Sequence, residues 1–404
     1  MKFIYFPLPA LPATLEERRR ERPIAYKTER WQKMFDELVE LARMCEDLGF
    51  EAFSLPEHHL HTEGLEVGSV PQLFHHIAMQ TKRIKVGPVG YVLPGWDPIR
   101  LAVNIAWLDQ LTKGRTIVGF ARGYQTRWLN QMAQKLHVGA TVSDQGEVDQ
   151  ANRRAFEEVF QVLRLAWKEE PFRFKGEHYE YPFPYETGTP WPPHAWTEEC
   201  GSPGEVKDGK VVALDVVPKP YQKPHPTLFQ AFSLSEATIR WCAKQDIVPM
   251  ILTSQSEALR LLFTAYQEES AKHGRKISRG KSVGVLRQVY FGSDEEVFRM
   301  SEIGSVGMLW KKFWGHFGFW EAFRLPGDAE GQMLPASEWT LDRMKKSQYA
   351  MTGSVSEVRR GMDQLVEDGN PEWLALLSDQ GMLPLEQVKQ QLRIFGEQVL
   401  PHYR

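Results

Sequence analysis

The sequence predicts an α/β fold, a (β/α)8 TIM barrel with long insertions. Three observations predict it: strand-like and helix-like segments alternate along the chain, eight such units can be counted, and the strand-like segments are continuously apolar. Alternating units with short connections favour a parallel sheet, and continuously apolar strands indicate that both faces of that sheet are buried. Eight units favour a closed barrel over an open sheet.

Each expected element follows from a local pattern. The expected strands are apolar, β-prone segments at residues 2–6, 52–55, 84–93, 116–120, 227–231, 247–252, 282–292 and 373–377. Apolar residues at helical spacing predict helices between them, with Gly49 ending the first helix and Asp97-Pro98 beginning the one that runs to about Leu111. Further helices are expected at about 69–81, 144–168 and 255–273, from about 235, and after the last strand.

Two long segments break this alternation, at about 171–226 and 303–345. The first is rich in proline, glycine and aromatic residues, and the second is rich in tryptophan and phenylalanine. Long irregular stretches inside a compact domain are often functional loops or insertions. We therefore expect residues 1–404 to form a single domain that carries these two insertions.

The composition excludes several classes of protein. The chain has 404 residues, of which 42% are hydrophobic and 25% charged, and its net charge of −3 gives no basic surplus for nucleic acid. No apolar run approaches the ~20 residues of a membrane-spanning helix. The run Arg18-Arg19-Arg20 follows the first apolar segment, which is the wrong order for a secretory signal. Three distant cysteines argue against a disulfide framework and favour the cytoplasm.

Candidate site residues follow from the barrel itself, because active sites of TIM barrels lie at the carboxyl ends of the strands. The residues at those ends are Glu57-His58-His59, Val89-Gly90 and Leu93-Pro94, Arg122-Gly123-Tyr124, the stretch from Gln230 to Ser235, Thr253-Ser254, and the stretch from Arg287 to Tyr290. No G-x-G-x-x-G motif for a nicotinamide cofactor and no G-x-S-x-G nucleophile motif is present.

Among these residues, Arg122 and hydroxyls near the helix at 235 suggest an anion site. Ser233, Ser235 and Thr238 lie where free N–H groups and the helix dipole favour a phosphate, which an arginine grips through two hydrogen bonds. Ordinary helix capping is the alternative explanation for the serines.

The histidines after the second strand suggest acid/base chemistry. His58 suits proton transfer because the unperturbed pKa of histidine is ~6.5, and a buried structural histidine is the alternative. Metal binding is disfavoured, because adjacent histidines such as His58 and His59 rarely point to one centre and no second cluster has ligand spacing. We expect no metal.

In order and spacing, these segments resemble the bacterial luciferase-like flavin monooxygenases through nearly the whole chain. The resemblance rests on four pieces in this order. The first is Leu48-Gly49-Phe50 leading to Glu57-His58-His59, and the second comprises residues 84–94, Asp97-Pro98, 108–111, 113–115 and 119–123. The third comprises residues 230–233, 241–243 and 249–252, and the fourth comprises 353–355 and the tail 397–401. Phe232 departs from the pattern, because many relatives have glycine there.

The resemblance implies roles around the flavin ring. His58 takes the place of the histidine that transfers protons near the flavin, and Glu57 is a flavin-side contact. Val89 and Gly90 fall where the family carries a non-prolyl cis peptide under the isoalloxazine ring. Gln230 and Thr253 are further contacts of the cofactor.

The resemblance also implies roles around the flavin phosphate. Arg122 matches the phosphate-binding arginine, with Gly123 and Tyr124 lining the flavin. Ser235 and Thr238 match phosphate-side hydroxyls when the alignment is anchored on Trp241. Anchoring it on Gln230-Ala231 favours Ser233 instead.

The implied function is that of a two-component monooxygenase. It would use reduced FMN from a separate flavin reductase, and O2, to oxygenate a small organic substrate, and it would form a homodimer as its relatives do. One alternative is a deazaflavin (F420)-dependent oxidoreductase on the same barrel. Another is a non-catalytic flavin-binding subunit, although such proteins typically lose the residues that match His58 and Arg122.

Overall fold

The computed structural model describes residues 1–66, 70–329 and 332–404. These residues form two compact units, which are described separately. The first consists of Met1–Tyr91, Ile117–Ala121 and Thr227–Arg404, and the second of Val92–Thr116 and Arg122–Pro226. The organisation of the chain as a single domain with two insertions stays a prediction.

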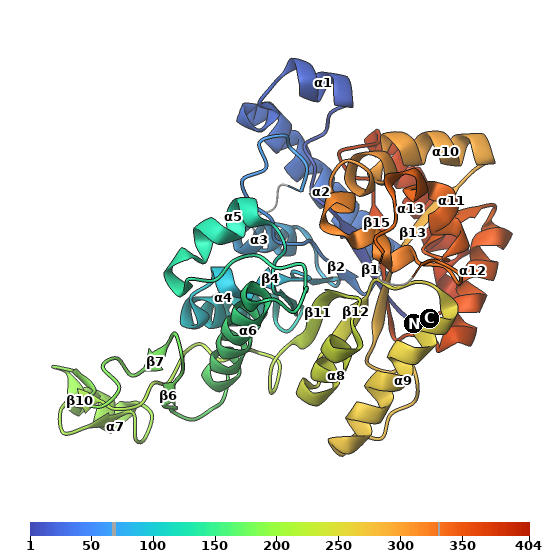
Figure 1. The fold of residues 1–404 in the computed structure, drawn as a ribbon. Helices are drawn as coiled ribbons and strands as arrows, with labels where there is room; N and C mark the ends of the chain where they lie inside the picture. Colours follow the sequence, from blue (N-terminus) through green and yellow to red (C-terminus); the bar gives the residue numbers. More distant parts are fainter. Residues whose placement is uncertain (67–69, 330–331) are drawn as a thin grey trace. The chain divides into compact units, whose positions relative to one another are not determined.

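The first unit is built on a curled parallel sheet, as expected (Figure 1). The strand order is β3-β2-β1-β15-β13-β12-β11-β5-β4, with β14 paired to β13. The strands are β1 (Lys2–Pro7), β2 (Ala52–Phe53), β3 (Lys85–Val86), β4 (Tyr91–Val92), β5 (Ile117–Ala121), β11 (Thr227–Ser233), β12 (Val248–Ile251), β13 (Gly284–Phe291), β14 (Ala350–Gly353) and β15 (Trp373–Ser378). Each of the eight expected strands is present, which confirms the TIM-barrel prediction, and β14 is additional.

The third expected strand differs from the prediction because it is split into β3 and β4. Between them, Val89 N–H donates to the carbonyl of Leu55 at 3.1 Å, and the carbonyl of Pro88 accepts from Gly119 N–H of β5 at 2.6 Å. The segment is therefore bonded on both sides. It closes the sheet between the second strand and β5, and β3 with β4 fill one strand position.

Helices lie around these strands (Figure 1). The longer ones are α2 (Thr28–Leu48), α3 (Val70–Gln80), α8 (Glu236–Gln245), α9 (Ser256–Lys272), α10 (Asp294–Ile303), α12 (Val355–Asp368) and α13 (Leu385–Gln398), and the short ones are α1 (Leu15–Arg20) and α11 (Leu341–Lys346). Helix α2 ends as expected at Gly49, whose left-handed backbone (φ 82°) suits glycine. The expected helices lie within a few residues of the observed bounds.

The segment 303–345 is irregular, as expected, and consists mainly of short turns. These are η4 (Val306–Trp310), η5 (Trp314–Phe317), η6 (Phe319–Phe323) and η7 (Ala336–Glu338), followed by α11. The ring of Trp310 lies edge-on to Trp314 at 4.6 Å, to Phe323 at 4.8 Å and to Tyr349 at 5.3 Å, and Trp320 completes the group at 5.9 Å. We call these five residues the aromatic cluster.

The second unit is mainly helical, with small strands in the other expected insertion. Its helices are α4 (Pro98–Thr112), α5 (Thr126–Met132), α6 (Glu147–Ala166) and α7 (His194–Cys200), with turns η2 (Leu93–Gly95) and η3 (Gln134–Leu136). Asp97 caps α4 as expected, accepting a hydrogen bond from Arg100 N–H at 2.8 Å. Within 171–226, β6 (Phe174–Lys175) pairs with β7 (Glu180–Tyr181), and β10 (Lys210–Val211) pairs with β8 (Thr189–Pro190) and β9 (Val206–Lys207). Figure 1 shows these strands and α7 together at one end of α6.

Candidate functional site

The loop after β2 carries Glu57, His58 and His59 in a buried setting. His59 Nε2 lies 2.8 Å from Glu57 Oε1, and Glu57 itself is buried. His58 is 8% exposed, and its burial, with His61 and His59 nearby, lowers its pKa well below 6.5. A histidine with such a pKa is neutral at neutral pH, so that one ring nitrogen carries a proton and the other accepts one.

The same loop carries Glu66, which has no solvent exposure and a left-handed backbone (φ 51°). Its Oε2 lies 3.5 Å from His58 Nδ1, and its Oε1 accepts a hydrogen bond from Trp314 Nε1 at 2.5 Å. The sequence analysis identified neither Glu66 nor Trp314. They are 248 residues apart, so only the folded chain shows the contact.

Arg18 holds this loop through hydrogen bonds to its backbone. Its Nη1 donates to the carbonyls of Glu63 and Gly64 at 3.1 and 3.0 Å, and its Nη2 to those of Leu11 and Gly381 at 2.6 and 3.2 Å. These carbonyls belong to the loops after β2, β1 and β15, so one buried side chain joins three loops at the carboxyl ends of the strands. Burial lowers the pKa of Arg18 to about 10, which leaves it protonated at neutral pH.

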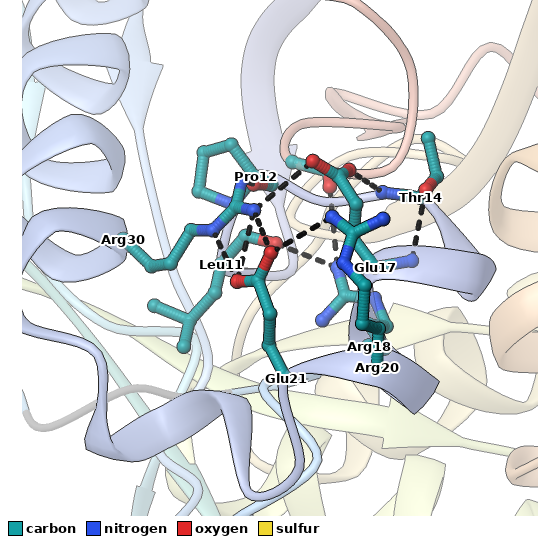
Figure 2. A network of polar contacts seen from close by, with 9 residues as sticks. Leu11, Pro12, Thr14, Glu17, Arg18, Arg20, Glu21 and Arg30 are labelled. Atoms are coloured by element: carbon teal, nitrogen blue, oxygen red, sulfur yellow. Dashed lines mark hydrogen bonds and ion pairs between the residues drawn. The ribbon is translucent and has the colours of Figure 1, made fainter.

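A second arginine, Arg30, forms ion pairs with the neighbouring carboxylates. Its Nη2 contacts Glu17 at 3.0 Å and Glu21 at 2.8 Å, and Figure 2 shows it beside Arg18. Arg18 is therefore bound through backbone carbonyls, while Arg30 forms the ion pairs. The sequence analysis had used the arginine run only to exclude a secretory signal.

Val89 and Gly90 lie between β3 and β4. Their peptide bond is cis, as the resemblance implied. A Cβ atom on Gly90 would lie 2.3 Å from the carbonyl carbon of Gly119 and 2.4 Å from the nitrogen of Phe120. Only glycine fits there, because the backbone of β5 occupies the space that a side chain would need.

Strand β11 carries Gln230 and Ser233, which are both buried. The side-chain oxygen of Gln230 has no hydrogen-bond partner among the described residues. A buried unpaired amide oxygen costs about 1–3 kcal/mol, so it favours a ligand that brings a donor. Between these residues the register with β12 shifts, and Phe232 adopts a positive φ of 23° with its ring 5.1 Å from that of Phe6. Glycine adopts a positive φ more readily than phenylalanine does.

Ser235 and Thr238 lie at the start of α8. Ser235 Oγ accepts from Thr238 N–H at 3.4 Å and lies 3.0 Å from Thr238 Oγ1, so Ser235 caps the helix, as the alternative explanation held. Thr253 follows the carboxyl end of β12, where the N–H of the preceding Leu252 donates to the carbonyl of Ser233 at 3.1 Å. The ends of β11 and β12 therefore bring Ser233 and Thr253 to the same edge.

Arg122, Gly123 and Tyr124 belong to the second unit. Arg122 Nη1 lies 2.6 Å from Asp149 Oδ1, and its Nη2 donates to Ser143 Oγ. Burial lowers the pKa of Arg122, although the Asp149 carboxylate opposes this. The sequence analysis did not identify Asp149, which is 1% exposed and also accepts from Thr141 Oγ1 at 2.7 Å.

Backbone conformation and close packing explain why a glycine follows Arg122 in the turn after β5. Gly123 has φ 84°, and a Cβ on it would lie 2.5 Å from side-chain atoms of both Leu129 and Val92. The hydroxyl of Tyr124 accepts a hydrogen bond from Gln125 Nε2 at 2.9 Å. Backbone conformation and packing therefore both require glycine beside Arg122.

The described residues are 1–66, 70–329 and 332–404. In these ranges no group of three His, Cys, Asp or Glu side chains is arranged to hold a metal ion. In the same part of the chain, none of the helices has the length and apolar character needed to span a bilayer.

Comparison with known proteins places the chain in a family. The sequence profile described as luciferase-like monooxygenase matches residues 1–372. The chain belongs to the luciferase-like monooxygenase family. It is 22% identical over 389 residues to 2,5-diketocamphane 1,2-monooxygenase 1 of Pseudomonas putida, which covers 95% of this chain and 97% of that protein.

Solved structures show the same fold at low identity. One is the oxygenating constituent of 3,6-diketocamphane monooxygenase from Pseudomonas putida, a type II Baeyer–Villiger monooxygenase in complex with FMN, with a TM-score of 0.71, 19% identity, and coverage of 99% of this chain and 98% of that one. Another is an F420-dependent secondary alcohol dehydrogenase with an F420–acetone adduct, with a TM-score of 0.63, 13% identity, and coverage of 100% and 99%. This chain therefore has the fold of an F420-dependent enzyme as well as that of an FMN-binding one.

Proposed function

We propose that this protein is the oxygenase component of a two-component flavin-dependent monooxygenase, which uses reduced FMN and O2 to oxygenate a small organic substrate. The observation that carries the proposal is the buried, neutral His58 at the carboxyl end of β2, in a chain of the luciferase-like monooxygenase family. A protein of the same fold that binds FMN, described as an oxygenating constituent, supports both the cofactor and a separate reductase. When bound, reduced FMN supplies the electrons that activate O2.

The first unit offers groups that fit a flavin ring. The buried Gln230 side-chain oxygen has no partner among the described residues, and the ring carries an N–H group that would satisfy it. We assign ring contacts to Gln230 together with Glu57, Val89, Gly90 and Thr253.

Hydroxyls and one cation are the candidates for the flavin phosphate. In the first unit these are Ser233, Ser235 and Thr238, close to the N-terminus of α8. In the second unit we assign phosphate binding to Arg122, with Gly123 and Tyr124 as flanking contacts. Arg122 has five N–H donors and uses Nη1 on Asp149 and Nη2 on Ser143, which leaves further donors for an anion.

We assign proton transfer to His58. Its burial excludes bulk water and keeps the ring neutral, so that it can accept a proton from a substrate and return it later. Water exclusion also protects an oxygen-activated cofactor from wasteful breakdown.

The test is anaerobic binding of reduced FMN followed by rapid mixing with O2. We expect the bound flavin to reoxidise more slowly than free reduced FMN, and His58→Ala to bind FMN but lose turnover. Reoxidation at the free-solution rate would reject the proposal, and full activity of His58→Ala would remove His58 from the mechanism.

The second candidate is an F420-dependent oxidoreductase, favoured by the shared fold of the F420-dependent alcohol dehydrogenase. It would transfer a hydride without O2. Parallel titrations with FMN and F420, monitored by fluorescence, separate the two functions by which cofactor binds more tightly.

The partners and location remain part of the proposal. We propose a homodimer, supplied with reduced FMN by a separate reductase, in the cytoplasm. Cys45, Cys200 and Cys242 are free thiols, which supports a reducing compartment. Analytical ultracentrifugation measures the oligomeric state directly.

A further inference from the structure

Three carboxylates and three histidines are paired within the loop that follows β2. Glu57 lies 2.8 Å from His59, Glu63 lies 3.6 Å from His61, and Glu66 lies 3.5 Å from His58. Both side chains of the last pair are buried, because Glu66 has no solvent exposure and His58 is 8% exposed. Glu66 is thus the carboxylate of this loop that faces the histidine assigned to proton transfer.

The position of Glu66 is fixed by both its backbone and a distant segment. Its φ of 51° lies in the left-handed region, which non-glycine residues rarely adopt and which persists where surroundings enforce it. Trp314 Nε1 donates to its Oε1, and the ring of Trp314 lies 4.6 Å from that of Trp310 in the aromatic cluster. Trp314 therefore holds one oxygen of the carboxylate, while His58 Nδ1 lies 3.5 Å from the other oxygen, at ion-pair distance and not in hydrogen-bond geometry.

We propose that Glu66 is a positioning residue that keeps the proton of neutral His58 on Nδ1, and that Trp314 holds Glu66 in place for this purpose. The Nδ1–H group then points to a carboxylate, and the lone pair on Nε2 is the one that accepts a proton. When Nε2 takes up that proton, the resulting imidazolium lies beside the negative charge of Glu66. A carboxylate behind a histidine sets tautomer, orientation and basicity in this way.

The catalytic role of Glu66 rests on the proposed function, whereas the tautomer of His58 can be measured without it. The tautomer of a histidine is measured without any cofactor, from the 15N chemical shifts of the two ring nitrogens in histidine-labelled protein. The signal of His58 is identified by its loss in His58→Gln. In the flavin-free wild type between pH 7 and 8, we expect the His58 proton on Nδ1.

The variants are chosen to keep shape while removing one interaction. Glu66→Gln should move the His58 proton largely to Nε2, and Trp314→Phe should shift the tautomer ratio in the same direction by less. Glu63→Gln is the matched control, because Glu63 is on the same loop, faces His61 and is partly exposed. A wild-type proton on Nε2 overturns the proposal, as does an unchanged ratio in Glu66→Gln.

Folding of Glu66→Gln is checked by circular dichroism, and where it fails, the wild-type tautomer and Trp314→Phe decide the question. The ionisable groups that act on His58 are Glu66 at 3.5 Å and the neighbouring His61 and His59, and Glu63 pairs with His61. The Glu63→Gln control therefore also shows how far a general change of charge moves the spectrum.

Kinetics give the second readout once monooxygenase activity is measured. Glu66→Gln should lower kcat by about 10- to 100-fold with KM within about twofold, because it changes the proton acceptor and not substrate binding. Glu63→Gln should leave both constants within about twofold. If no variant or wild type shows oxygenation, the proposed function fails while the nitrogen spectra still decide the role of Glu66.

Discussion

The guanidinium of Arg18 donates to the backbone carbonyl of Gly64 at 3.0 Å, and the same side chain binds carbonyls in the loops after β1 and β15. Because Gly64 belongs to the loop that runs from Glu57 to Glu66, this contact helps to hold the loop that carries His58. A Cβ on Gly64 would lie 2.9 Å from Arg18 Nη1, so the two residues also fit closely in space.

Replacing Arg18 should therefore destabilise the protein. Arg18→Met leaves buried carbonyl groups without donors, and we expect the free energy of unfolding to fall by about 3 kcal/mol. Urea denaturation measures this change. Arg19→Met, on the exposed side of the same helix, should stay within about 0.5 kcal/mol of the wild type. Equal losses in the two variants would contradict the role of Arg18.

The depressed pKa of His58 predicts loss of stability in mild acid. Because burial lowers the pKa in the folded state below the ordinary 6.5, the unfolded chain binds the proton more readily. The contribution is therefore fully present above pH 6.5 and decreases as the pH falls toward the folded pKa, by at most about 1.4 kcal/mol per pH unit. Urea unfolding from pH 5 to 7.5 should show this slope, and His58→Gln should reduce it. The exposed His273 provides the control, since His273→Gln should keep the wild-type slope.

The close approach of Gly90 to β5 predicts that even one methyl group is harmful. In Gly90→Ala the added Cβ would meet backbone atoms of Gly119 and Phe120, which cannot rotate away, so we expect a loss of about 3 kcal/mol. Gly95→Ala is the matched control, because its nearest neighbour would be Leu129 at 3.6 Å. Thermal unfolding compares the two variants. A Gly90→Ala variant as stable as Gly95→Ala would show that the backbone of β5 can move to make room for the methyl group.

Arg122 should affect phosphate recognition specifically. Arg122→Lys keeps the charge but loses the planar fork of donors, so we expect FMN affinity to fall about tenfold while affinity for riboflavin, which has no phosphate, is unchanged. Fluorescence titration with both flavins makes the comparison. Arg154 is an exposed residue of α6, so Arg154→Gln should alter neither affinity. A parallel loss for riboflavin would assign Arg122 a structural role.

The ion pair between Arg122 and Asp149 carries a separate prediction for stability. Asp149 is 1% exposed, so Arg122→Gln leaves its carboxylate buried without the cation, and the free energy of unfolding should fall by about 3–5 kcal/mol. Burial alone would raise the pKa of Asp149, but hydrogen bonds from Thr141, Arg122 and Gln145 outweigh it and lower that pKa. The wild-type contribution is thus present above about pH 4 and lost below it, which acid titration of unfolding can follow.

The barrel strands could be predicted from the sequence because each is an apolar run buried on both faces. The local pattern did not show the split between β3 and β4, since residues 84–93 are mainly apolar and the break depends on hydrogen bonds to Leu55 and Gly119. Strand β14 (Ala350–Gly353) was missed because it is short and pairs only along part of β13.

The candidate site likewise contains residues that the sequence could indicate and residues that only the folded chain shows. Residues at strand ends, such as His58 and Arg122, could be proposed from topology and resemblance. Their carboxylate partners could not, because nothing in the sequence links Glu66 to Trp314 or Arg122 to Asp149 before the chain folds. A buried glutamate on a short loop after a strand is a weak signal in itself.

The chain path through the two units has an evolutionary consequence. Strands β5 and β11 are hydrogen-bonded neighbours, with Thr227 opposite Ile117, although more than a hundred residues of sequence separate them. Residues 171–226 can therefore be lengthened, shortened or exchanged between relatives without altering the ladder that joins these strands. The pairing of β5 with β11 thus sets no limit on the length of this segment.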